Sequence, residues 1–438
     1  MSPKNPRPFQ EGERITLTPT RLGSRDEALA EYEGWRVRVQ GGIPGEAAHV
    51  RVLHVSKGGP MAVARFLEPV GDAHPARRPP PCPIHGPCGG CGWQHVHETA
   101  AFQMKIDAAG RLFPETAFEA GITSPRAFAY RAKAFLLPQM QKGRLVFGAR
   151  PPRGEKLVDT TGCEVLRPEL ERIAEAARAF LSDGRDVKEL RSILLRGNRQ
   201  GETQFTLVHR DESTRWVGLA GEIARRGGAQ AAFVQHHPAP GNRVQSDEEE
   251  VLAFGSGPLH ERFSGLEVVV PPTAFCQGNP GVADKLYGAI AERVTGSRVV
   301  ELFCGTGVAG LLALVEDDSR TLLGVDLAPR AVAAAKQNAE HNGLAQRCEF
   351  RAADASTIDL SGADTLLVNP PRAGCSEAIC KGAVDSGAAS LLYLSCNAET
   401  LARDIERMAG GGFRLESLIP ADMFPQTPHL EVLATLRR

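Results

Sequence analysis

The chain has 438 residues, enough for two to four domains with cores of their own. Hydrophobic residues make up 42% and charged residues 24%, as is typical of a soluble protein, and the formal net charge of −1 neither supports nor excludes RNA binding. The N-terminal stretch MSPKNPRPFQEGERITL is polar, and no apolar run approaches the roughly 20 residues that a membrane span needs. We therefore expect a cytoplasmic protein with no signal peptide and no membrane contact.

Residues 9–71 alternate apolar and polar positions between Gly and Pro turns, as in RITLTPTRLG, GWRVRVQGGIPGEAAHVRVLHV and MAVARFLEPV. An alternation of this period is typical of strands that bury one face. It predicts a small antiparallel β-barrel over 9–71. A Pro-rich segment at 74–83 then leads into a mixed α+β central domain, which we assign to 72–262.

Four cysteines of the central domain form a candidate metal site. Cys82, Cys88 and Cys91 lie within ten residues, and Cys163 follows much later. In a reducing cytosol such thiols are not expected to form disulfides. Four thiolates suit zinc or an iron–sulfur cluster, but structural zinc sites usually use two Cys-x2–4-Cys pairs and only Cys88 and Cys91 make one. An iron–sulfur cluster, zinc and four unligated thiols all stay open on the residues alone.

The stretch FAYRAKAFLL at 128–137 brings Tyr130, Arg131 and Lys133 together. An aromatic ring among cations is typical of a surface that stacks on bases and binds phosphates. A solvated face of a strand explains the same pattern.

From Val299 the pattern becomes strand, glycine turn, helix, strand and helix, which predicts a doubly wound parallel sheet in a domain over 263–438. The segment RVVELFCGTGVAGLLAL carries G-x-G-x-x-G at Gly305, Gly307 and Gly310, and Asp326 ends the next strand. Such glycines let a ligand approach the backbone, and the carboxylate accepts hydrogen bonds from ribose hydroxyls. NAD and S-adenosylmethionine both satisfy this motif, and a turn that binds nothing is the third possibility.

After Asp326 we expect a helix with Pro329 near its first turn and Asn342-Gly343 as its C-terminal stop. The next two strands favour a methyltransferase. CEFRAADA ends a third strand at Asp354, and ADTLLVNPPRAG ends a fourth at Asn369-Pro370-Pro371. Pro370 keeps Asn369 extended, so that its side chain is presented at the carboxyl edge of the sheet. Asn-Pro-Pro at this place is typical of S-adenosylmethionine methyltransferases that act on a planar nitrogenous ring or amide. A plain turn at the end of a strand is the alternative.

The stretch LLYLSCNAETLARDI places Cys396 where a buried strand ends, and it predicts Asn397 as the N-cap of a helix from Ala398 to the glycines at 410–412. Methylation of an exocyclic nitrogen needs no thiol. Methylation of pyrimidine C5 does, because a nucleophile must add to C6 before C5 can react. The nearby helix N-terminus predicts a lowered pKa for Cys396. A small buried hydrophobic residue is the alternative role.

Methylation of C5 also needs a base that removes the C5 proton. In DMFPQTPHLEVLATLRR, Glu431 enters a final apolar strand shortly after His429. A carboxylate in such a place is costly unless it has a partner or a function. A salt-bridged Glu431 is the alternative, in which case His429 is the next candidate base.

With these motifs the chain resembles the RNA 5-methyluridine methyltransferase family over essentially its whole length. GGIPGEAAHVRV looks like the middle of a TRAM domain, the RNA-binding β-barrel that opens many members. SCNAETLARDI resembles the nucleophile motif of the family, and PHLEVL its general-base motif. FCQGNPGV at 275–282 resembles the segment that precedes the methyltransferase core.

This resemblance implies an enzyme that uses S-adenosylmethionine to methylate uridine C5 in RNA, with the target uracil flipped out of its stack. It implies that Cys396 is the nucleophile and Glu431 the base. The residues expected to line the cofactor and uracil site are Gln277, Phe303, Asp326, Asp354 and Asn369. The resemblance also implies a [4Fe–4S] cluster on the four cysteines, in preference to zinc, with a structural or RNA-positioning role.

The RNA target depends on finer likenesses. Many relatives have Asp where this chain has Asn369, and several have Asn at the position of Val308. VNPPRAG and DMFPQTPHLEVL resemble the subgroup that methylates large-subunit ribosomal RNA, whose short members lack a TRAM domain. We therefore expect 23S ribosomal RNA rather than transfer RNA as the substrate, and a monomeric enzyme.

Two other functions compete with this interpretation. A non-catalytic RNA-binding protein is disfavoured, because binding requires neither Cys396 nor Glu431. A nitrogen methyltransferase that uses Asn369-Pro370-Pro371 remains an alternative, and for it Cys396 would be dispensable.

Overall fold

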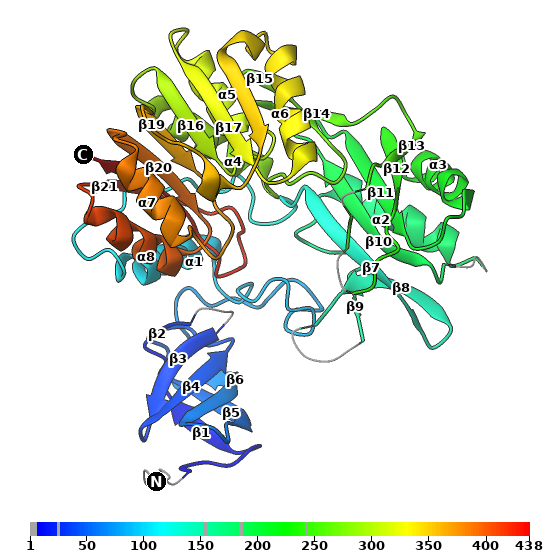
Figure 1. The fold of residues 1–438 in the computed structure, drawn as a ribbon. Coiled ribbons are helices and arrows are strands. Elements are labelled where there is room, and N and C mark those ends of the chain that lie inside the picture. Colours follow the sequence, from blue (N-terminus) through cyan, green and yellow to red (C-terminus); the bar gives the residue numbers. More distant parts are fainter. Residues whose placement is uncertain (1–6, 24–26, 152–155, 184–186, 242–243, 247) are drawn as a thin grey trace. The chain divides into compact units, whose positions relative to one another are not determined.

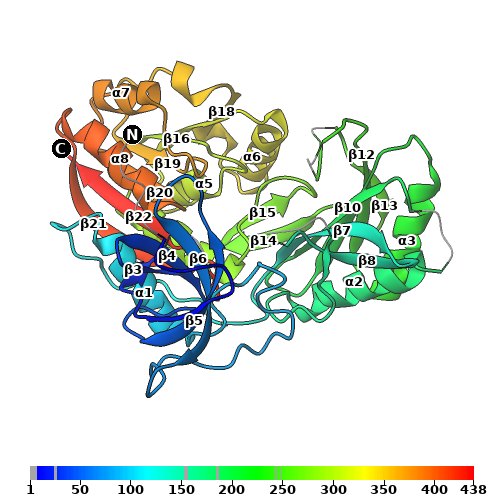
Figure 2. The same ribbon diagram turned by 90° about the horizontal axis from the view of Figure 1, so that it is seen from below.

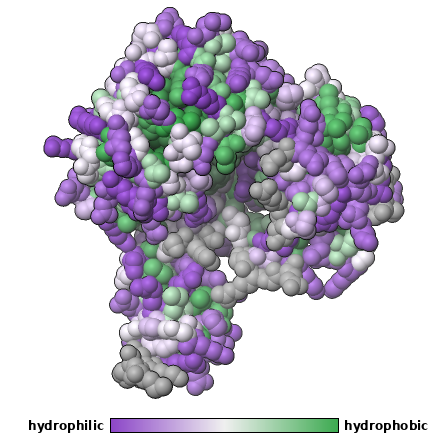
Figure 3. Space-filling model, in the orientation of Figure 1, coloured by the Kyte–Doolittle hydropathy of each residue, from purple (hydrophilic) through white to green (hydrophobic). Residues whose placement is uncertain are grey.

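The computed structural model describes residues 7–23, 27–151, 156–183, 187–241, 244–246 and 248–438. It divides into two compact units, Met1–Arg111 with Phe424–His429, and Leu112–Met423 with Leu430–Arg438 (Figure 1). Within the described ranges, no helix combines the length and the hydropathy that crossing a membrane requires. Hydrophilic residues cover most of the visible surface of each unit (Figure 3).

The first unit contains a six-stranded sheet in the order β1-β5-β6-β4-β3-β2. Its elements are β1 (Arg14–Leu17), β2 (Arg21–Leu22), β3 (Glu27–Tyr32), β4 (Trp35–Gln40), β5 (Ala48–Val55), β6 (Met61–Pro69) and the helix α1 (Glu98–Gly110). Alternate residues of β4, namely Trp35, Val37 and Val39, are buried in one apolar core, as the alternating sequence predicts. Pairings among the described residues leave β1 and β2 as the two ends of the sheet, so the β-rich region is confirmed while its closure into a barrel stays a prediction. The prediction of antiparallel pairing is wrong at one place, because β4 and β6 run parallel.

The second unit begins with a seven-stranded sheet in the order β13-β12-β11-β10-β7-β8-β9. Its elements are β7 (Lys133–Gln141), β8 (Arg144–Ala149), β9 (Val158–Asp159), α2 (Pro168–Leu181), β10 (Leu190–Gly197), β11 (Thr203–His209), α3 (Arg215–Gly227), β12 (Ala231–His236) and β13 (Val251–Phe254). Helices α2 and α3 pack together on one face of this sheet around the fully buried Trp216 (Figures 1 and 2). A hairpin of β14 (Leu259–Phe263) and β15 (Leu266–Val270) follows.

A second seven-stranded sheet, in the order β18-β17-β16-β19-β20-β22-β21, forms the C-terminal part of this unit. Its strands are β16 (Arg298–Leu302), β17 (Thr321–Asp326), β18 (Cys348–Ala352), β19 (Thr365–Val368), β20 (Ser390–Ser395), β21 (Arg414–Ala421) and β22 (Glu431–Arg437). Its helices are α4 (Pro280–Arg293), α5 (Val308–Val315), α6 (Pro329–His341), α7 (Glu377–Asp385) and α8 (Ala398–Ala409), with short 3-10 turns η1 (Ala345–Arg347) and η2 (Ala355–Thr357).

Strands β16 to β20 are parallel, and only β22 and β21 run antiparallel to their neighbours. This confirms the predicted doubly wound sheet. From β16 the chain adds strands outward in both directions, β17 and β18 on one side and β19 and β20 on the other, with helices between them. Helix α4 packs on α5, and α7 packs on α8.

The predicted ends of two helices are confirmed. Helix α6 starts at Pro329 and ends at His341, immediately before Asn342-Gly343. Helix α8 starts after Asn397, whose side chain accepts a hydrogen bond from the Glu399 amide at 3.1 Å. These boundaries matter for function because they fix where β17 and β20 release the chain at the edge of the sheet.

Candidate active site

Five parallel strands end at one edge of the C-terminal sheet, and a predicted site residue stands at or just after each end. They are Phe303 after β16, Asp326 at the end of β17, Asp354 after β18, Asn369 after β19 and Cys396 after β20. Parallel strands share their carboxyl edge, and ligands of such folds bind where the strand order reverses. Here the order reverses between β16 and β19, which places Phe303 and Asn369 at that point.

The glycine turn after β16 is held by two carboxylates. The Gly305 amide donates to Asp326 Oδ2 at 2.9 Å, and the Gly310 amide donates to Glu301 Oε2 at 3.1 Å. A Cβ atom at Gly310 would lie 2.6 Å from that Glu301 oxygen, which only glycine avoids. Burial raises the pKa of Glu301 to about 8. The turn is therefore tied to both β16 and β17.

A hollow of about 560 Å³ opens beside this turn and is lined by Phe303, Gly305 and Asn369 among others. Phe303 adopts a φ of +61°, in the left-handed region that non-glycine residues rarely occupy. Such strain costs about 1–3 kcal/mol and tends to occur at functional sites. An aromatic ring, a glycine turn and a side-chain amide form a lining that suits a nucleoside cofactor such as S-adenosylmethionine.

The two acidic residues of this edge differ in their surroundings. Asp326 also accepts a hydrogen bond from the Ala328 amide, at 2.9 Å. Asp354 is exposed and accepts from the amide and the hydroxyl of Ser356, each at 2.8 Å. These bonds, the backbone one first, lower the pKa of Asp354, which keeps it ionised at neutral pH.

Two exposed apolar side chains were missed by the sequence analysis. Phe275 lines the hollow and is 67% exposed, and Leu327, directly after Asp326, is 74% exposed. Large apolar side chains in such positions commonly mark binding surfaces. Phe275 lies inside the motif FCQGNPGV, so the sequence contained a signal that could have identified it. Nothing in the sequence indicates that Leu327 is exposed.

The segment that carries Gln277 is anchored by the first half of the second unit. The Ala132 amide donates to the Gly278 carbonyl at 2.8 Å, Gln245 Nε2 donates to the Thr273 carbonyl at 2.9 Å, and Arg196 donates to the Ala274 carbonyl. Gln277 is buried and lines a second, smaller hollow, which shares Val270 and Cys276 with the first. Gln277 therefore lies beside the hollow that Phe303 and Asn369 line.

Cys396 and Glu431 are brought together by strand pairing. β20 and β22 are antiparallel with Ser395 opposite Val432. Continuing this register by one residue sets Cys396 opposite Glu431. Glu431 is only 5% exposed, and within the described part of the chain no cation forms an ion pair with it. The salt-bridged alternative for Glu431 therefore finds no support.

The electrostatics of this pair differ from the sequence-based expectation. Burial raises the pKa of Glu431 to about 7. Burial, followed by the nearby Glu431 carboxylate, also raises the pKa of the Cys396 thiol, and Arg372 offsets this in part. The predicted lowering of the Cys396 pKa by the helix N-terminus is wrong, because the thiol is half-buried beside a carboxylate.

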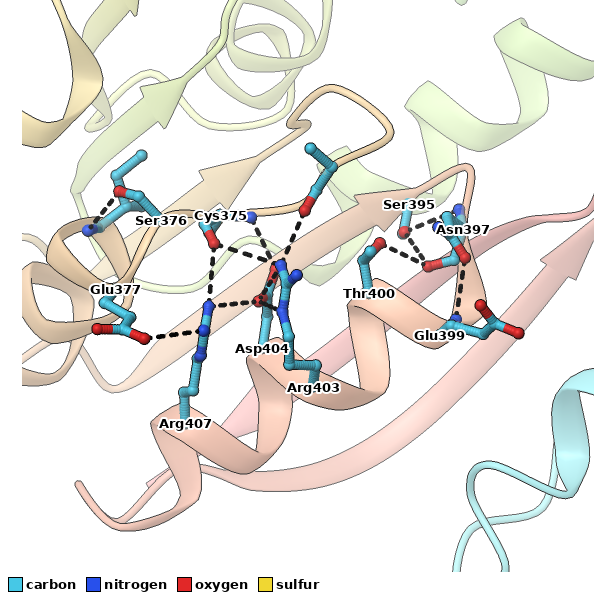
Figure 4. A network of polar contacts seen from close by, with 12 residues as sticks. Cys375, Ser376, Glu377, Ser395, Asn397, Glu399, Thr400, Arg403, Asp404 and Arg407 are labelled. Atoms are coloured by element: carbon cyan, nitrogen blue, oxygen red, sulfur yellow. Dashed lines mark hydrogen bonds and ion pairs between the residues drawn. The ribbon is translucent and has the colours of Figure 1, made fainter. Parts of the chain in front are cut away.

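A buried carboxylate fixes the helix that follows Cys396 (Figure 4). Asp404 of α8 accepts hydrogen bonds from the Cys375 amide at 2.7 Å, the Tyr393 hydroxyl at 2.8 Å and Arg403 Nη2 at 2.8 Å. Cys375 belongs to the loop after Asn369, and Tyr393 to β20. Asp404 therefore connects the strand that leads to Cys396, the helix that leaves it and the loop that follows Asn369.

The structure changes the interpretation of the stretch at 128–137, which was expected to bind RNA. Tyr130 is only 4% exposed, so the prediction that it offers a ring for base stacking is wrong. Arg131 donates from Nε to the carbonyl of Lys133 at 3.1 Å. Lys133 itself lines the smaller hollow.

The predicted cluster cysteines fall in both units. Cys82, Cys88 and Cys91 are half-buried in the first unit, in a stretch where Gly86 and Gly89 take positive φ angles of 87° and 70°. Such tight turns suit a chain that wraps around a bulky group. Cys163 belongs to the second unit and packs against its α2–α3 core, so the four-thiolate site stays a prediction.

His429 also falls in the first unit, where its ring lies 6.4 Å from that of Phe424. Its candidacy as an alternative base therefore stays a prediction.

The fold and the edge of the sheet define a Rossmann-like methyltransferase. The structure of the Pyrococcus abyssi tRNA (uracil-54, C5)-methyltransferase matches with a TM-score of 0.77 at 21% identity, over 96% of this chain and 100% of that one, which establishes the fold. Residues 268–438 match the model of the tRNA (Uracil-5-)-methyltransferase family.

Relatives extend this likeness over the whole chain. An uncharacterized RNA methyltransferase of Parasynechococcus marenigrum is 30% identical, covering 99% of this chain and 97% of that protein. One of Thermosynechococcus vestitus is 31% identical, covering 98% of this chain and 99% of that protein. The chain belongs to the family of these RNA methyltransferases.

The burial of Glu431 predicts a pH-dependent stability. Its pKa is higher in the folded than in the unfolded protein, so the folded state binds more protons between about pH 4.5 and 7, and its stability falls as pH rises through this window. Glu431→Gln removes this cost. We compare the free energies of unfolding of the variant and the wild type, measured with urea. The difference in favour of the variant should be about 2 kcal/mol larger at pH 8 than at pH 5, since one pKa unit corresponds to about 1.4 kcal/mol.

The matched control is Glu406→Gln, which neutralises an exposed carboxylate on α8. Its stability difference from the wild type should be the same at both pH values. A Glu431→Gln difference that also stays constant with pH would contradict the raised pKa.

Proposed function

We propose that this RNA methyltransferase transfers a methyl group from S-adenosylmethionine to C5 of a uridine in RNA. The single observation that carries the proposal is the pairing of a thiol with a buried carboxylate at the edge of the sheet, with Cys396 opposite Glu431 in the β20–β22 register. Binding of RNA alone requires neither group, and methylation of an exocyclic nitrogen requires no thiol.

In the proposed reaction, the Cys396 thiolate forms a bond to C6 of a flipped-out uracil, and the electron pair of the C5–C6 bond moves onto the ring as an enolate. The enolate electron pair then forms a bond from C5 to the methyl group, while the bond between that methyl group and the donor sulfur breaks and S-adenosylhomocysteine leaves. Glu431 removes the C5 proton, the C5–C6 double bond re-forms, and the bond between Cys396 and C6 breaks to return the thiolate. No electrons enter or leave the ring overall.

The raised pKa of Glu431, about 7, suits this role. A base works best when its pKa lies near the working pH, since enough of it is then ionised while it still binds a proton strongly. Its burial also keeps the carboxylate away from water, which would otherwise hydrate and weaken it. The negative charge of Glu431 raises the pKa of Cys396, so the thiolate forms more readily when Glu431 is protonated.

S-adenosylmethionine supplies the electrophilic methyl group. The residues that we assign to its binding and to the uracil are those at the strand ends and on the anchored segment: Phe303, Asp326, Asp354, Asn369 and Gln277. The glycine turn at Gly305 lets the ligand approach the backbone, and Asp326 is suited to the ribose hydroxyls.

For the substrate we propose 23S ribosomal RNA in preference to transfer RNA. The support is the resemblance of VNPPRAG and DMFPQTPHLEVL to the large-subunit subgroup. We further propose that the β-rich N-terminal region is a TRAM domain that binds RNA, and that the enzyme is a cytoplasmic monomer. Nucleoside mass spectrometry of separated ribosomal and transfer RNA from a deletion strain tests the target: loss of 5-methyluridine from transfer RNA only would overturn the ribosomal assignment.

The roles of the two residues predict a trapped intermediate. Glu431→Gln keeps the size of the side chain but cannot accept the C5 proton, so elimination of Cys396 should stall after methyl transfer. Incubation with RNA and S-adenosylmethionine should then give a protein–RNA adduct that persists on a denaturing gel.

The adduct should be absent from the double variant Cys396→Ala, Glu431→Gln. Cys396→Ala alone should lose methyl transfer while it still binds S-adenosylmethionine in calorimetry. Normal turnover of Glu431→Gln without an adduct would assign the base elsewhere, and turnover by Cys396→Ala would eliminate the C5 mechanism.

We propose that Cys82, Cys88, Cys91 and Cys163 hold a [4Fe–4S] cluster. The soft thiolate set supports it, and so do the glycine turns around Cys88. The purified protein should be brown, with the broad visible absorbance of an iron–sulfur cluster, and Cys88→Ser should bleach it. A colourless protein that contains one equivalent of zinc would overturn the assignment.

A further inference from the structure

The smaller hollow contains two cations that face each other across neighbouring strands. Arg196 of β10 stands directly opposite Lys133 of β7 in their antiparallel register. Both line the hollow, together with Cys276 and Gln277 of the anchored segment. Like charges directly opposite each other on a sheet are destabilising.

Arg196 is buried without full compensation. It is only 3% exposed, and of its three guanidinium nitrogens Nη2 donates to the Ala274 carbonyl while Nε and Nη1 have no hydrogen-bond partner. Among the described residues, no carboxylate forms an ion pair with Arg196 or Lys133. Glu261, which also lines the hollow, instead accepts from Arg199 Nε at 3.2 Å and from the Arg199 amide at 3.0 Å. The burial of two donors without acceptors costs free energy unless a ligand supplies the acceptors.

Lys133 is also a cation without a carboxylate partner among the described residues. Its pKa is lowered to about 7, first by burial and then by the charge of Arg196. Its Nζ lies 5.5 Å from the ring centroid of Phe275, the exposed aromatic residue at the larger hollow. An anion between the two cations would accept from a free guanidinium donor of Arg196 and return the charge to Lys133.

We infer that Arg196 and Lys133 form a binding site for one phosphate group of the RNA strand, next to the methyltransferase site. The inference rests on the proposed action of the protein on RNA. It assigns a contact with the RNA strand to two residues that take no part in the proposed C5 chemistry. Two observations favour a phosphate. Arg196 keeps two buried donors without acceptors beside a second cation, and the cations border an exposed aromatic ring, the combination with which proteins bind single-stranded RNA. The carboxylate of S-adenosylmethionine is the other anion that a methyltransferase meets.

The test is the double variant Lys133→Met, Arg196→Met, which keeps side-chain length and removes both charges. The probe is a fluorescein-labelled, uridine-containing single-stranded 20-nucleotide RNA, titrated by anisotropy at several salt concentrations without S-adenosylmethionine. We expect the affinity to fall about tenfold and the slope of log K against log salt to lessen by about 0.7, the change for one phosphate contact on a single strand. Arg225→Met, which removes an exposed cation on α3, should change neither quantity to this extent.

Two further measurements separate the alternatives. The single variant Lys133→Met, which leaves the bond between Arg196 and the Ala274 carbonyl in place, should keep its affinity for S-adenosylmethionine in calorimetry. A Lys133→Met protein that loses this affinity but keeps the RNA affinity and salt slope would overturn the inference and assign the site to the cofactor carboxylate. The Tm of the double variant should equal or exceed that of the wild type, since unpaired buried cations are removed. A lower Tm with an unchanged salt slope would mean that Arg196 only anchors the Ala274 carbonyl. This result would also overturn the inference. Because no turnover is measured, failure here is independent of the Cys396 and Glu431 roles.

Discussion

The proposed activity depends on the burial of one carboxylate where two antiparallel strands meet. Glu431 begins β22, and pairing with β20 sets it beside the thiol that ends β20. Withdrawal from water raises the pKa of Glu431 to about 7, and its proximity raises the pKa of Cys396 as well. A stable protein gains nothing from this arrangement, since a buried carboxylate without a cation costs free energy. A reaction that first needs a nucleophile and then a base explains why the cost is retained.

The rest of the second unit holds this edge of the sheet in place. The buried Asp404 connects β20, α8 and the loop after Asn369, while backbone hydrogen bonds fix the segment that carries Gln277. The glycine turn is tied to β16 and β17 through Glu301 and Asp326. Groups from distant parts of the sequence thus meet on rigid elements, as a reaction that requires ångström-level positioning demands.

Much of this arrangement was predictable because it follows from local rules. Strand–turn–helix patterns, the prolines at 329 and 370 and the Asn397 cap fixed the element boundaries, and the geometry of parallel strands then gathered five candidate residues at one edge. What failed depends on tertiary burial, which no local pattern contains. The helix terminus predicted a lowered pKa for Cys396, but desolvation and Glu431 outweigh it. Tyr130 belongs to a stretch whose composition is typical of RNA binding, and it is nevertheless buried. The Arg196–Lys133 pair depends on a strand register that the sequence does not specify.

The central claim is that the enzyme replaces the hydrogen at C5 of uridine by a methyl group. Release of tritium measures this step directly, because RNA that carries tritium at uridine C5 loses it to water only when that hydrogen is removed. With wild-type enzyme and S-adenosylmethionine, we expect one tritium released for each methyl group transferred from a carbon-14-labelled donor, after correction for the fraction of uridines that carry tritium at C5. Methyl transfer to RNA without any tritium release would contradict it and would assign the methyl group to another atom.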